Sequence, residues 1–114
     1  MTLNELTLSD GEVLELISKP GRVRLIFRSW DEKLWNIMFE DVVAFECFGA
    51  EGEDLDGLII DESNDFKSRA TMRLCDENLS DHRAYEFVSA WSGVVVLSVI
   101  AKSVRVGEEV DLKI

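Results

Sequence analysis

The one histidine of the chain stands where a sequence motif could suggest nucleophilic chemistry. His82 follows Ser80 and Asp81, so a serine, a carboxylate and an imidazole occupy three consecutive positions. Catalytic triads instead bring these groups together from separate elements, so that a third group orients the base. The chain also lacks the Gly-x-Ser-x-Gly turn that exposes the nucleophile of α/β-hydrolases. We therefore expect His82 to be an exposed turn residue, and the sequence predicts no catalytic residue.

Carboxylates are numerous enough to meet by chance, with 23 Asp and Glu among 114 residues. General acid–base catalysis needs two carboxyl groups whose environments separate their pKa values, and a sequence does not reveal those environments. Glu46 is the one acid in an apolar context, between Phe45 and Phe48. On a strand, this position predicts an outward-facing side chain rather than a catalytic one.

The acidic middle of the chain can be compared with two kinds of metal site. An EF-hand loop ending at Glu62 would have Asp56 at the position that requires glycine, so that template fails. A looser divalent-cation site is the alternative, and its ligands would be Asp54, Asp56, Asp61 and Glu62. Cys47 and Cys75 form no metal-ligand spacing, and we expect both to be buried thiols. The sequence predicts no metal and no cofactor.

Charge segregation is the strongest non-random feature of the sequence. No Lys or Arg occurs from residue 34 to residue 66, whereas the same segment holds ten acids. One interpretation is a solvated acidic surface that keeps the protein soluble. The other is a docking surface for a basic protein, because such surfaces steer association. The candidate partner-binding residues are Trp30, Glu51, Glu53, Asp54, Asp56, Asp61 and Glu62.

The tryptophans divide into two expected environments. Trp35 and Trp91 lie in strand-like patterns and are expected in the core. Trp30 lies in the turn 29–31 beside an acid, where it either packs at the edge of the core or is exposed. An exposed tryptophan beside acidic residues would suit an interface anchor.

The elements that must position these residues follow a period of two, which is typical of strands. Val23, Leu25 and Phe27 alternate with arginines, and the turn Pro20-Gly21 joins this run to a preceding one, so a hairpin is expected over 12–29. Similar runs predict further strands at 35–39, 43–47, 66–74, 94–106 and 110–114.

Two segments are less regular. Residues 83–91 fit a strand or a helix, and their aromatic and β-branched content favours a strand. Residues 49–65 are expected to form a long surface excursion, which Leu58 to Ile60 anchor or cross as a short strand. The predicted fold is mainly β: a single domain over 1–114, built as an antiparallel β-sandwich or a partly open barrel or meander with at most one short helix.

Composition excludes several classes of function. Twelve Lys and Arg against 23 Asp and Glu give a formal charge of −11, which is unsuited to binding nucleic acid because phosphates need clustered cations. The longest apolar run, near residues 94–101, is far shorter than the roughly 20 residues of a membrane span. The first residues lack the basic and apolar regions of a signal peptide, so a cytoplasmic location is expected.

A family resemblance adds to these observations. The pattern from Trp35 through Ile37, Phe39 and Val42 to Phe45, followed by an acidic segment and a late Tyr85-x-Phe87 strand, resembles that of small β-rich bacterial proteins. Some proteins of that type are encoded beside secreted toxins and are thought to act as immunity proteins. The resemblance implies a stoichiometric inhibitor that masks the active site of a toxin.

We therefore expect a non-enzymatic protein that binds a basic protein partner through residues 51–65, with Trp30 as its aromatic anchor. A small-molecule carrier or small enzyme is the first alternative, and its apolar pocket would be lined by Phe27, Trp35, Phe39 and Phe45. The second alternative is a homo-oligomer subunit whose exposed strand edges pair across a symmetry axis. The oligomeric state, monomer or homodimer, is left open.

Overall fold

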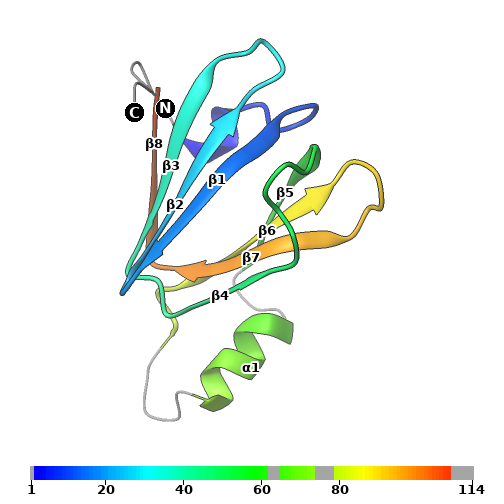
Figure 1. Cartoon of the computed structure of the whole chain (residues 1–114). Helices are drawn as coiled ribbons and strands as arrows, with labels where there is room; N and C mark the ends of the chain where they lie inside the picture. The colour runs from blue at the N-terminus through cyan, green and yellow to red at the C-terminus, as the bar shows by residue number, and fades with distance from the viewer. Residues whose placement is uncertain (1, 62–64, 74–78, 109–114) are drawn as a thin grey trace.

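The computed structural model describes residues 2–61, 65–73 and 79–108. Within these residues the chain forms a mainly β structure of two antiparallel sheets, ordered β1-β2-β3-β8 and β4-β7-β6-β5 (Figure 1). The strands are β1 (Glu12–Lys19), β2 (Arg22–Arg28), β3 (Leu34–Glu40), β4 (Ala44–Cys47), β5 (Leu55–Asp61), β6 (Arg83–Ser89), β7 (Val95–Ala101) and β8 (Ser103–Glu108). The expected antiparallel β architecture is confirmed.

The two sheets meet at a corner, where the chain passes from one sheet to the other at two connections. Residues 41–43 lead from β3 into β4, and Lys102 alone separates β7 from β8. Because β3 pairs with β8 and β4 pairs with β7, both bends fall side by side. The Val43 N–H donates to the Ile100 carbonyl at 3.0 Å, and the Lys102 N–H donates to the Glu40 carbonyl at 3.2 Å. Asp41, in the first of these bends, adopts a left-handed backbone conformation with a φ of 53°.

The edge strands β1 and β5 approach each other at the other side without forming a ladder. A single bridge joins Glu12 to Asp54. Beside it, the Asp10 N–H donates to the Leu55 carbonyl at 3.0 Å and the Leu55 N–H to the Gly11 carbonyl at 2.8 Å. The described strands therefore form two facing sheets rather than a closed barrel.

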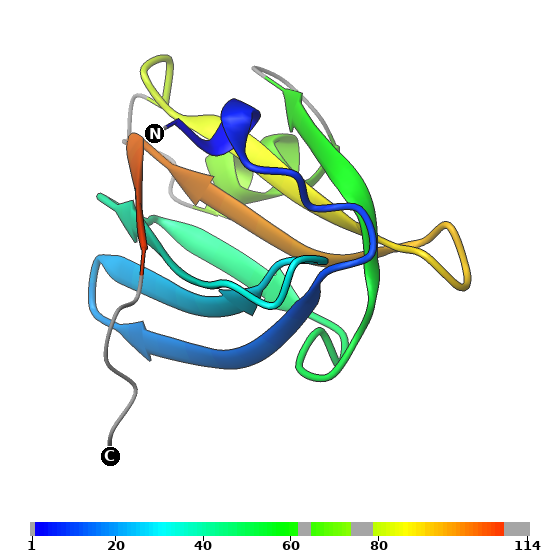
Figure 2. The same cartoon turned by 90° about the horizontal axis from the view of Figure 1, so that it is seen from above.

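The N-terminal segment fills the gap that this incomplete closure leaves. It begins with a 3-10 turn, η1 (Leu3–Glu5), that contacts β8, and then runs beside β5 toward the start of β1 (Figure 2). Leu3, Leu6 and Leu8 are each buried in the main core. This segment thus supplies apolar side chains where no strand covers the space between the sheets.

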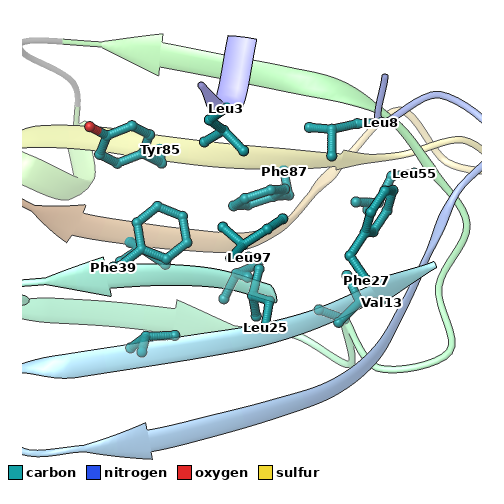
Figure 3. Close-up of a cluster of buried hydrophobic side chains, with 14 of the residues drawn as sticks. Leu3, Leu8, Val13, Leu25, Phe27, Phe39, Leu55, Tyr85, Phe87 and Leu97 are labelled. Carbon is teal, nitrogen blue, oxygen red and sulfur yellow. The ribbon is translucent and has the colours of Figure 1, made fainter. Parts of the chain in front are cut away.

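The core lies between the facing sheets and is rich in aromatic side chains. Phe39 packs against Tyr85 with ring centroids 5.1 Å apart, and against Phe87 edge-on at 6.0 Å (Figure 3). Offset and edge-to-face pairs of this kind are favoured by the charge distribution of aromatic rings. Alternation places Leu25 and Phe27 inward, and both are fully buried. The hairpin expected over 12–29 is confirmed by the β1–β2 register.

The strand expected from Phe66 onward is wrong, because this segment forms helix α1 (Asp65–Arg73) on the outer face of the second sheet (Figure 1). Phe66 and Ala70, one helical turn apart, pack with Ala84 and Ile100 of β6 and β7. Lysine, arginine, alanine and methionine favour helices. The period of two was imitated because Lys67, Arg69, Thr71 and Arg73 alternate with the uncharged Ser68, Ala70 and Met72. The helix explains why β7 is buried on both faces.

Several smaller expectations are resolved by the same topology. Residues 83–89 form a strand, which confirms the favoured assignment, although the strand ends before residue 90. The supposed surface excursion contains β5, whose Leu55 is fully buried. Ser103 begins a strand in the other sheet rather than continuing β7. Cys47 is exposed instead of buried, while Cys75 and the strand expected at 110–114 lie outside the described residues.

Gly11 allows the start of β1 to pass over a core ring. A Cβ at this position would lie 2.1 Å from Cζ of Phe27 and 2.9 Å from the backbone oxygen of Arg28. We predict that Gly11→Ala lowers the free energy of unfolding by about 1–3 kcal/mol, because the buried ring cannot move aside freely. Gly57→Ala is the matched control, since a Cβ there meets nothing within 4 Å. Urea denaturation of both variants measures the difference, and equal stability would contradict this packing.

Tyr85 provides a spectroscopic test of burial because it is the only tyrosine. Desolvation raises the pKa of its hydroxyl above the ordinary value of 10.0, and the nearby charge of Arg83 offsets part of this rise. We predict that phenolate absorbance appears only above pH 10. Because the folded state holds this proton more tightly, the associated stability is present below the unfolded pKa and is lost as pH rises through the folded one. Unfolding curves of Tyr85→Phe should lack that loss.

Candidate functional site

Four of the predicted partner-binding acids lie close together at the start of β5. Glu51 is exposed in a tight turn with Gly52, whose φ is 81°. Glu53 and Asp54 are half-buried, and Asp56 is exposed on β5. The structure therefore brings these carboxylates to one end of the sandwich, where β1 also begins.

Of the remaining predicted acids, Asp61 lies apart from this group. Asp61 ends β5, so the strand separates it from Asp56 by about 16 Å at the usual rise per residue. Glu62 lies outside the described residues. The expected docking segment 51–65 therefore does not form one continuous patch, because β5 carries Asp61 toward the opposite end of the sheet.

Backbone hydrogen bonds fix the acidic turn against its neighbours. The Gly52 N–H donates to the Val13 carbonyl at 2.7 Å, and the Glu53 N–H donates to the Ala50 carbonyl at 3.0 Å. Ala50 itself is fully buried. The Asp54 carbonyl accepts a hydrogen bond of 2.9 Å from the N–H of Ala90. The turn is consequently held in place from β1 on one side and from the end of β6 on the other.

Ser89, the last residue of β6, links the acidic turn to the β6–β7 connection. Its side chain is fully buried, and its hydroxyl donates to a carboxylate oxygen of Glu53. Oγ of Ser89 itself accepts hydrogen bonds from the backbone N–H groups of Trp91 at 3.2 Å and Ser92 at 3.4 Å. One buried hydroxyl therefore orders both the acid and the turn that follows.

Trp91 is the aromatic side chain that this arrangement presents to solvent. The sequence pattern predicted Trp91 in the core, and this prediction is wrong. The side chain is 81% exposed, because β6 ends two residues before it. The indole Nε1–H donates to Oδ2 of Asp54 at 3.3 Å. Val94, in the same connection, is also exposed. A large apolar ring is thus set directly beside the acidic turn.

Trp30 is exposed as well, at 64%, so packing at the edge of the core does not occur. It lies in the β2–β3 turn at the same end of the sandwich (Figure 1). This turn follows Arg28, whose side chain pairs with Glu12, the residue bridged to Asp54. The half-buried Trp35 instead donates its Nε1–H to the Ser29 hydroxyl at 3.0 Å.

Asp31 adds another carboxylate to this end. The Ser29 hydroxyl donates to the Asp31 carboxylate, and this hydrogen bond lowers the pKa of Asp31 below its ordinary value of 3.8. A hydrogen bond to the ionised form has this effect in general. Asp31 is therefore negatively charged at neutral pH beside the exposed Trp30. The sequence predicts Trp30, but not Asp31, as a partner-binding residue.

Residues considered for catalysis or metal binding have other surroundings. His82 lies in the expected turn but is half-buried rather than exposed, and its carbonyl accepts a hydrogen bond from Lys67 Nζ at 2.8 Å. Glu46 is half-buried and pairs with Arg69 at 3.3 Å. Among the described residues, no three His, Cys, Asp or Glu side chains are grouped to hold a metal ion.

The aromatic side chains expected to line one pocket are dispersed. Phe27 and Phe39 are fully buried in the core, whereas Phe45 is 40% exposed on the edge strand β4. Phe45 borders a groove of about 490 Å³ between β4 and the β1–β2 turn. The four rings named from the sequence therefore do not form a common ligand pocket.

Comparison of the chain with protein-family models, curated proteins and solved structures finds no match. In the part of the chain that the structure describes, no helix has the length and apolar character needed to cross a membrane.

The hydroxyl of Ser89 can be tested as the element that orders this surface. We predict that Ser89→Ala lowers the free energy of unfolding by about 1–3 kcal/mol, because two backbone N–H groups and the Glu53 carboxylate lose their partner. The exposed Ser18 on β1 supplies the control, and Ser18→Ala should change stability by less than about 0.5 kcal/mol. Thermal unfolding compares the two, and similar midpoints would argue against the network.

Proposed function

We propose that this protein is a non-enzymatic binding protein that docks a basic region of a partner protein onto its acidic end. The observation that carries the proposal is Trp91, 81% exposed and hydrogen-bonded to Asp54 within the acidic turn. Tryptophan is enriched among the residues that carry most of the binding energy at the centres of protein interfaces. Its position is fixed by the backbone hydrogen bonds of the turn.

Electrostatics favour a basic partner for this end of the molecule. Glu51, Asp56 and Asp31 present carboxylates there, and the segment 34–66 contains no cation. The nearby Arg28 is already paired with Glu12. A concentrated negative field accelerates encounter with a positive surface, whereas burial of an aromatic ring slows dissociation. The acids would steer the basic partner toward this end of the molecule. Trp91 would make the main contact, and Trp30 would lie at the border of the interface.

An immunity-type role is the form of this function that the family resemblance suggests. In that role the acidic end would cover the basic, substrate-binding surface of a bacterial toxin in the cytoplasm. Such an inhibitor has to bind but not to catalyse a reaction. A charged surface with an exposed aromatic side chain on an ordered turn is suited to binding of this kind. The partner would bind in a ratio of one to one.

The proposal predicts two separable effects on a partner captured from the lysate of the native host at low salt. Trp91→Ala should weaken binding by about 30-fold or more, the usual loss at an interface hot spot, mainly through faster dissociation. Glu51→Lys combined with Asp56→Lys should slow association and flatten its dependence on salt. Surface plasmon resonance at several salt concentrations measures both rates.

Asp61→Lys is the matched control, since it reverses a charge on the same strand at the distant end. It should leave the association rate and the salt slope close to those of the wild type. If the control slows association as much as the double variant does, only net charge matters and the acidic end is not the docking site. Unchanged dissociation of Trp91→Ala would remove the aromatic anchor from the proposal.

A further inference from the structure

A second surface feature lies toward the other end of the sandwich, where β6 begins. A groove of about 600 Å³ separates the N-terminal segment from β6 and β8. Its volume is within the range of roughly 300–1,000 Å³ that is typical of small-molecule sites. Its polar lining includes Arg83, Arg105 and Tyr85, and its apolar lining includes Ile60, Val104 and Val106. The groove therefore has a polar part and an apolar part.

The two arginines are unexpected in a protein with a formal charge of −11. Arg105 pairs with a carboxylate oxygen of Glu40. In contrast, no acidic side chain of the described residues forms an ion pair with Arg83. Among the described residues, Arg83 is thus the arginine of the groove that is in no ion pair, and one such cation suits a ligand with a single negative charge.

Tyr85 gives independent support for a ligand with a hydrogen-bond acceptor. The residue is only 4% exposed, yet it lines the groove. Its ring packs on Phe39, and its hydroxyl points away from Phe87 (Figure 3). Within the described parts of the chain, this hydroxyl has no protein hydrogen-bond partner, and its oxygen is not among the buried unpaired polar atoms, so it is open to an acceptor in the groove. Burial raises the pKa of Tyr85, so the hydroxyl keeps its proton and can donate at neutral pH.

We infer that this groove binds a small amphipathic monocarboxylate. The carboxylate accepts hydrogen bonds from the Arg83 guanidinium and the Tyr85 hydroxyl, and guanidinium groups match the planar geometry of a carboxylate. The apolar tail lies along Ile60, Val104 and Val106. All three side chains are half-buried and line the groove, and the two valines belong to the edge strand β8. This site is separate from the acidic docking end, because Tyr85 lies near the start of β6 and Trp91 follows its end.

Decanoate is the probe, and isothermal titration calorimetry measures its binding to the full chain. Decanoate should bind in a saturable way and at least about tenfold more tightly than decanol, which lacks the charge, or acetate, which lacks the tail. Arg83→Gln and Tyr85→Phe should each weaken decanoate binding by about tenfold, since each removes a hydrogen bond to a charged group. Tyr85→Phe keeps the ring that packs on Phe39.

Arg22→Gln is the matched control, because it removes one exposed positive charge outside the groove. It should bind decanoate like the wild type. In the wild type, bound decanoate should also move the phenolate absorbance of Tyr85 to higher pH, an effect that a purely structural tyrosine would not show.

Three results would each overturn the inference. These are the absence of saturable binding at millimolar decanoate, equal affinity for decanol and decanoate, and equal weakening by Arg22→Gln and Arg83→Gln. Circular dichroism of each variant, compared with the wild type, shows that the fold is intact before affinities are compared. Neither partner docking nor its salt dependence enters these measurements, so this test can fail independently of the proposed function.

Discussion

The arrangement depends on the corner at which β3 turns into β4 and β7 turns into β8. Each bend would expose backbone groups if it occurred alone. Because the two bends are adjacent, Val43 and Lys102 donate hydrogen bonds across the corner to residues of the neighbouring strand. The facing sheets that result bury Phe39 against Tyr85 and Phe87. They also leave β1 and β5 close enough to meet at the acidic end.

The acidic end combines order with exposure. Most of its loops are short and bonded to strands, so Trp91 is exposed on a fixed backbone. The buried hydroxyl of Ser89 forms hydrogen bonds with the Glu53 carboxylate and with the backbone N–H of Ser92. One side chain therefore stabilises two separate segments of this surface. A preordered surface loses little conformational entropy when it binds, and this favours high affinity for its size.

The sequence predicted the strands well where one face is apolar and the other charged, as in β2 around Leu25 and Phe27. The prediction of a strand failed for α1, because charged and uncharged residues alternate in this segment as they do in a strand. The packing of Ala70 against Ile100, which favours the helix, cannot be read from the local pattern. The acidic cluster was visible from composition, but its aromatic partner was not. Trp91 looked like a core residue because the end of β6 is set by Ser89, whose network involves residues more than thirty positions away.

The order of the strands also bears on how the chain folds. β1, β2 and β3 pair with sequence neighbours, as do β5, β6 and β7. The ladders between β3 and β8 and between β4 and β7 instead join residues fifty or more positions apart. Closing such distant contacts costs chain entropy before any burial compensates for it. We therefore expect the two three-stranded meanders to form early and their union at the corner to limit the folding rate.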